Sequence, residues 1–132
     1  MINTISIALS GLNAATQKLN ASASNVANVT TAGSLEDGGK APYDALTTQQ
    51  KAQENGGVRS DVVSSGRPFV PAYDPDSPFA NAEGIIGAPN VDLAEEAVTM
   101  NLAEMTYKAN IATLKTAEEM SDELLNIFDD DA

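Results

Sequence analysis

The chain contains no cysteine and no histidine, and these absences remove most of the common catalytic and metal-binding chemistry. Without cysteine there is no disulfide framework and no thiolate nucleophile. Without histidine the chain lacks the usual general base near neutral pH and the commonest metal ligand. A Ser-His-Asp or Cys-His arrangement is therefore impossible, and we expect no catalytic residues and no metal site.

Sequence motifs for binding phosphate groups or calcium are also missing. Neither GxxxxGK[ST] nor GxGxxG occurs in the chain. The stretch "DPDSP", residues 74–78, begins like a calcium loop but lacks the later glycine and the bidentate glutamate, so a turn stiffened by proline is the better interpretation. We therefore expect no cofactor and no enzymatic activity.

Basic residues are scarce, since 7 Lys and Arg stand against 19 Asp and Glu, and the formal net charge is −12. A chain this acidic has no basic surface with which to displace counterions from phosphates, so we expect no nucleic-acid partner. No run of about 18 apolar residues occurs, so no membrane insertion is predicted. The N-terminus has neither a basic region nor a long apolar one, so we expect no cleaved signal peptide.

The first of three segments, residues 1–31, predicts a long helix. Lys18 is its only charged side chain, and it ends in the small uncharged stretch "ASASNVANVTTAG", residues 21–33. We interpret its polar face as buried against other protein, where charge is costly to desolvate; an ordinary amphipathic helix is the alternative. Apolar or small residues recur in alternating steps of three and four, as in a helix that packs along another helix: Ile2, Ile5, Leu9, Leu12, Thr16, Leu19, Ala23 and Val26.

The middle segment, residues 32–89, holds all six prolines and most of the glycines, and its periodicity is weak. Asn55-Gly56-Gly57 is a good hairpin turn, because glycine tolerates positive φ. The sequence predicts a small β-rich or irregular segment here.

The third segment, residues 90–128, gives the strongest helix signal, with Asp92 as its N-cap. Because it carries two apolar stripes, we expect two partners, of which the shorter first helix can cover only one. Residues 129–132 hold three aspartates that oppose the helix dipole, and they predict a solvated acidic tail or a patch facing a basic neighbour. The stripes are Val98, Leu102, Met105, Ala109 and Ala112, and Met100, Ala103, Tyr107, Ile111, Leu114, Ala117, Leu124 and Phe128.

Three groups of residues, in order, resemble motifs of the bacterial flagellar basal-body rod proteins. Residues 24–28, "SNVAN", followed by Thr31 and Gly33, are similar to the family's helix-end signature "SNLANxxTxG". Residues 72–92, "AYDPDSPFANAEGIIGAPNVD", resemble a run of its proximal-rod members, and residues 107–120 follow its "YxAN…TAxEM" order. Each motif is weak alone, but their order and separation over nearly the whole chain are specific.

The resemblance implies a mainly α subunit whose long N- and C-terminal helices pair as a coiled coil, with the middle segment outside. Such subunits are exported from the cytoplasm by the flagellar type III apparatus. They assemble with copies of themselves and with other rod proteins into a helical tube, the periplasmic rod of the basal body, which transmits motor torque. The alternative is a small acidic cytosolic adaptor or export chaperone that binds a client through an exposed helix stripe.

The residues predicted to form the interface between subunits lie on both helices. Tyr107 is expected either to pack in the core or to lie between subunits, and Asn110 to fix the helix register. The predicted set is Ile5, Leu9, Leu12, Leu19, Asn25, Val26, Ala27, Asn28, Val98, Leu102, Met105, Tyr107, Asn110, Ile111 and Leu114.

Overall fold

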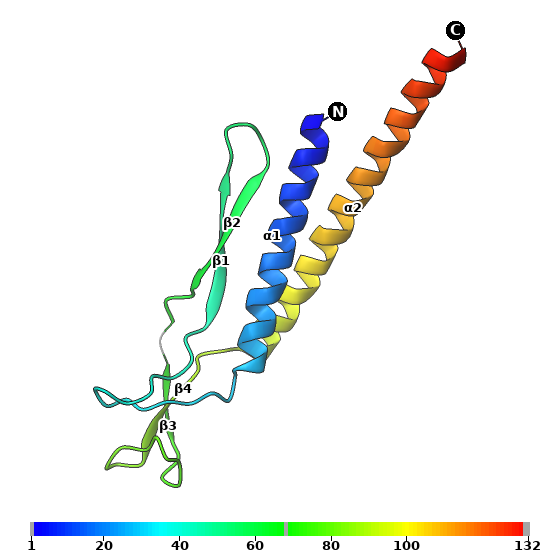
Figure 1. Cartoon of the computed structure of the whole chain (residues 1–132). Coiled ribbons are helices and arrows are strands. Elements are labelled where there is room, and N and C mark those ends of the chain that lie inside the picture. The colour runs from blue at the N-terminus through cyan, green and yellow to red at the C-terminus, as the bar shows by residue number, and fades with distance from the viewer. Residues whose placement is uncertain (1, 68, 131–132) are drawn as a thin grey trace.

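The computed structural model describes residues 2–67 and 69–130, which form two long helices and two β-hairpins (Figure 1). In chain order the elements are α1 (Ile2–Ala27), β1 (Leu46–Ala52), β2 (Val58–Ser64), β3 (Val70–Tyr73), β4 (Ile85–Ala88) and α2 (Leu93–Asp130). The prediction of a mainly helical chain with a small β-containing middle is confirmed. Helix α2 continues through Asp130, past the predicted boundary at residue 128, and residues 131–132 of the predicted tail lie outside the described residues.

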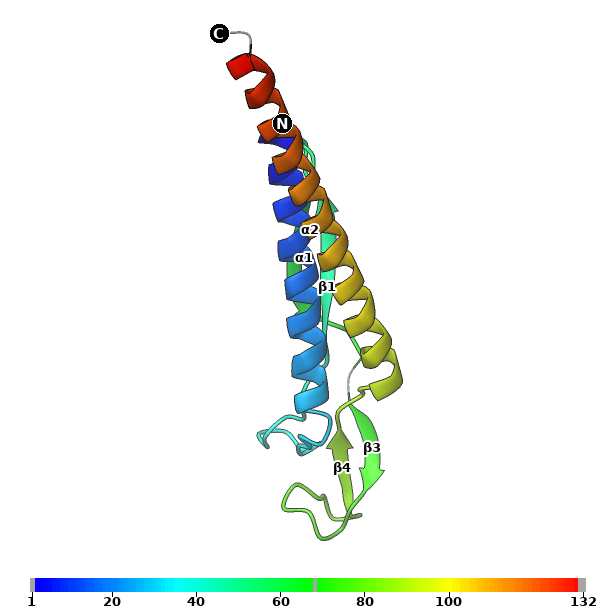
Figure 2. The same ribbon diagram turned by 90° about the vertical axis from the view of Figure 1, so that its right-hand side faces the viewer.

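Helix α1 lies between the β1–β2 hairpin and α2, with the two helices antiparallel (Figures 1 and 2). The β3–β4 hairpin lies at the other end of the molecule from the two termini. Among the described residues no strand packs against α2, and α1 is the one other element that does. Neither described helix has an apolar stretch long enough to cross a membrane.

Local sequence signals account for the ends of these elements. The carboxylate of Asp92 accepts hydrogen bonds from the backbone N–H groups of Ala94 at 2.8 Å and Glu95 at 3.3 Å, which confirms the predicted N-cap of α2. Gly56 and Gly57 have positive φ values of 84° and 86°, and they close the antiparallel β1–β2 hairpin at the predicted turn.

The β3–β4 hairpin is joined to the segment that follows α1 by a glycine pair. The backbone groups of Gly33 and Gly87 exchange two hydrogen bonds of 2.9 Å. A Cβ atom on Gly33 would collide with the backbone nitrogen of Pro42, so only glycine fits at this position of the crossing. The crossing therefore fixes the second hairpin close to the end of α1.

Small side chains make up most of the buried apolar core of the described residues. Ile86 is its one large member, and the others are Ala8, Ala14, Ala15, Ala21, Ala45, Ala103 and Ala117. Alanines allow two helices to approach closely. The approach is closest at Gly11, where a Cβ atom would collide with the side-chain amide of Asn110. Since each alanine buries little apolar area, this core contributes less free energy than one built from leucine or phenylalanine.

Candidate assembly interface

The apolar stripe predicted on α1 lies on the outside of the chain. Ile5, Leu9 and Leu19 are 39%, 52% and 40% exposed. The small side chains of α1 instead face inward, Ala8 and Ala15 among them, against α2 and the β1–β2 hairpin. The small side chains of α1 are therefore buried against other parts of the same chain, whereas its polar residues Asn13 and Asn20 are exposed, so the structure does not show the predicted burial of a polar face against other protein.

Helix α2 has two apolar stripes, and α1 covers only one of them, as the sequence predicts. On the covered side Ala103 and Ala117 are 1% and 4% exposed. Because successive residues rotate by about 100° around a helix, the other stripe lies about 100–160° around the helix from Ala103. Its larger members Val98, Leu102 and Met105 are 60%, 50% and 67% exposed. The described residues therefore leave this stripe uncovered.

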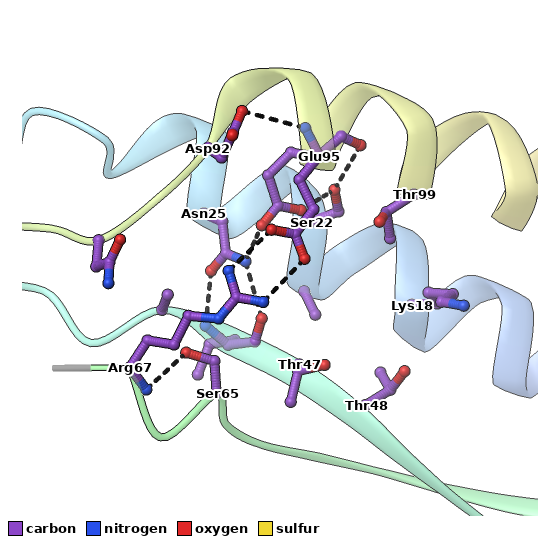
Figure 3. A pocket seen from close by; sticks show the side chains of 15 residues that line it. Lys18, Ser22, Asn25, Thr47, Thr48, Ser65, Arg67, Asp92, Glu95 and Thr99 are labelled. Carbon is purple, nitrogen blue, oxygen red and sulfur yellow. Dashed lines mark hydrogen bonds and ion pairs between the residues drawn. The ribbon is translucent and has the colours of Figure 1, made fainter.

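A polar junction at the C-terminal end of α1 joins both helices to the middle segment (Figure 3). Asn25, only 2% exposed, donates from Nδ2 to the backbone oxygen of Leu46 at 2.8 Å and to the Glu96 carboxylate at 2.6 Å. Its Oδ1 accepts from the Leu46 N–H at 2.7 Å and from the Tyr43 hydroxyl at 3.0 Å. The amide thus uses its full hydrogen-bonding capacity inside the chain. The structure therefore places Asn25, one of the predicted interface residues, within the subunit.

Two hydroxyl groups extend this junction. The buried Ser22 donates to the Glu96 carboxylate, and Ser24 lies 3.0 Å from the Tyr43 hydroxyl. The sequence did not predict the contacts of Ser22, Tyr43 or Glu96. The only local signal for them was an uncharged helix end, which would be poorly suited to solvent.

An exposed ion pair lies beside the junction. Arg67 donates to both oxygens of Glu95, at 2.8 Å and 3.1 Å. This hydrogen bonding and the attraction between the charges lower the pKa of Glu95 and raise that of Arg67. Because the pKa of Glu95 is lower in the folded chain than in the unfolded chain, the ion pair stabilises the fold at pH values above the pKa of the unfolded chain. This stabilisation is lost as the pH falls through the pKa of the folded chain. Because both groups face solvent, salt screens the attraction and the contribution is small.

Six further residues of the predicted interface fall into two groups. Near the end of α1, Ala27 is exposed, Val26 and Asn28 are half-buried, and Asn28 bonds the backbone oxygen of Ser24 at 2.9 Å. Leu12, Ile111 and Leu114 are half-buried on the helices.

Tyr107 and Asn110 both lie on the side of α2 that faces α1. Tyr107 is 44% exposed and borders a groove that it shares with Ala15 and Leu19 of α1. Asn110 packs on Gly11 and donates to the backbone oxygen of Thr106 at 2.8 Å. Asn110 therefore makes its contacts within the chain, whereas part of the Tyr107 side chain remains exposed.

Two kinds of comparison agree on what the chain is similar to. Residues 82–127 match the family described as Flagellar basal body rod FlgEFG protein C-terminal. The flagellar basal-body rod protein FlgC of Yersinia enterocolitica is 36% identical over 126 residues, covering 91% of this chain and 92% of that protein. FlgC of Buchnera aphidicola from Acyrthosiphon pisum is 36% identical over 133 residues, covering 96% and 97%. FlgC of Aquifex aeolicus is 32% identical over 126 residues, covering 91% of each.

Proposed function

The chain belongs to the FlgC family of flagellar basal-body rod proteins, and on this premise we propose that it is a structural subunit of the flagellar rod. The family is structural, and the chain is not an enzyme. We further propose that copies of the chain assemble with one another and with other rod proteins into a helical tube. That tube transmits motor torque across the periplasm, and the subunit reaches it through the flagellar type III export apparatus.

The observation that carries this proposal is the pair of uncovered apolar faces. The α1 face includes Leu9, 52% exposed, and the α2 face includes Leu102, 50% exposed, and Met105, 67% exposed. Contiguous apolar surface of this kind on a chain with a small core marks contact with other protein. Because the two faces differ, a contact between them on neighbouring copies is heterologous, and heterologous contacts generate rings or helical assemblies.

The spacing of the buried side chains supports a coiled-coil pairing of α1 with α2. On α1, Ala8, Ala15 and Ser22 are buried and lie seven residues apart. On α2, Ala103 and Ala117 are buried fourteen residues apart, with Asn110 midway between them. A seven-residue repeat is the period of helices that supercoil around each other. We propose that this pair forms the inner layer of the rod and that the hairpins lie outside it.

The test is the content of purified hook–basal bodies. We expect mass spectrometry to detect the chain there, and deletion of its gene to abolish both the rod and motility. Deletion of the gene with normal rods and normal swimming would contradict the proposal. Recovery of the chain only in the cytosol, bound to a client, would support the adaptor function instead.

A further inference from the structure

Helix α2 extends past the start of α1. It has 38 residues, whereas α1 has 26, and the first turn of α1 lies beside Ala117 and Met120 of α2. Residues 121–130, here named the α2 overhang, continue beyond α1 (Figures 1 and 2). At 1.5 Å per residue the overhang is about 15 Å long. Figure 1 shows no other helix or strand beside the overhang.

The face of α2 that binds α1 continues along this overhang. Leu124 follows Ala117 by seven residues, as Ala117 follows Asn110, so it occupies the next position of the same repeat. Leu124 and its neighbours Leu125 and Ile127 are 41%, 62% and 53% exposed. The overhang is therefore an extension of the α1–α2 interface without its α1, and the geometry of that interface indicates a helix as its occupant.

Charge selects which helix can occupy this face. Glu118, Glu119, Asp122 and Glu123 are exposed around this end of the helix, and no lysine or arginine follows Lys115 in the sequence. Two overhangs would repel each other at these carboxylates. Residues 1–35 carry Lys18 and no acid, so α1 is the helix of this chain that can approach without repulsion.

We propose that the α2 overhang of one copy packs on the exposed face of α1 in a second copy. Ile5 and Leu9, at the N-terminal end of that face, supply the apolar surface. The acids stay at the rim of the contact in solvent, because an uncharged partner does not require them to be buried. The contact rests on the proposed function and adds to it the identity of the two surfaces. Being heterologous, it leaves a free α1 face and a free overhang at the ends of a row of copies.

The natural absence of cysteine allows a direct test by cross-linking. Leu125→Cys and Leu9→Cys are placed in separate chains and co-expressed in cells that lack the native chain. A short bis-maleimide is then applied to purified basal bodies. Both positions are exposed, so neither change disturbs the fold. We expect a mixed dimer at least tenfold more abundant than when Asn126→Cys replaces Leu125→Cys. Asn126 is an exposed neighbour that points about 100° away around the helix.

Each other result overturns the contact. Equal cross-linking with Asn126→Cys would show no preference for the proposed face. Dominant dimers of Leu125→Cys with itself would show that overhangs pair with each other. If basal bodies contain both chains but give no mixed dimer, the proposed contact is wrong and the proposed function is unaffected. If neither chain is found in basal bodies, both the contact and the proposed function are wrong.

Discussion

Replacing Asn25 with alanine is expected to destabilise the isolated chain by on the order of 3–5 kcal/mol and to abolish rod assembly. The substitution removes four hydrogen bonds of 2.6–3.0 Å at a site that is 2% exposed. The backbone N–H and C=O of Leu46 both lose their Asn25 partner, and the Glu96 carboxylate loses a donor. Each buried polar group left without a partner costs about 1–3 kcal/mol.

Urea unfolding followed by circular dichroism measures this effect. Asn20→Ala is the matched control, because it removes the same amide from an exposed position on the same helix, and it should change stability by no more than about 0.5 kcal/mol. Equal urea midpoints for the two variants would mean that the polar junction does not hold the middle segment to the helices.

Leu102→Glu is expected to leave the isolated chain folded and to reduce rod assembly, and with it swimming, at least tenfold. Leu102 is 50% exposed and lies about 100° around α2 from the buried Ala103, so the carboxylate stays hydrated in the free chain. In a rod that buries this stripe the same carboxylate would lose water without gaining a partner, and the cost is several kcal/mol. A tenfold loss requires only about 1.4 kcal/mol.

Circular dichroism of the free variant and the yield of basal bodies from cells test this pair of outcomes. Lys115→Gln serves as the control, because it changes the net charge by the same amount at an exposed position on the same helix. Normal rod yield from Leu102→Glu would show that the outer stripe of α2 is not an assembly surface.

The sequence predicted the helices, the N-cap at Asp92 and the turn at Gly56-Gly57, because each depends on neighbouring residues. It did not predict which face of α1 is buried within the chain. Periodicity places the larger apolar side chains on one face, and a single domain would normally bury them. Here the close approach at Gly11 selects small side chains for the inner face, so Leu9 remains outside.

The polar junction was harder to predict for a different reason. Ser22 and Glu96 are 74 residues apart, and Tyr43 lies in a segment without clear periodicity. Only the fold brings these three side chains to Asn25, so no local pattern could indicate their contacts. The uncharged helix end was a sign of burial, but it did not distinguish burial within the chain from burial between subunits.

Amide hydrogen exchange, compared between the dilute chain and assembled rods, tests the central claim that neighbouring subunits complete the two helices. A core of alanines leaves the free helices only partly stabilised. We predict incomplete protection of residues 3–29 and 98–127 in the free, folded chain and a large gain on assembly. Strong protection throughout residues 3–29 in the free chain, unchanged in rods, would contradict the account.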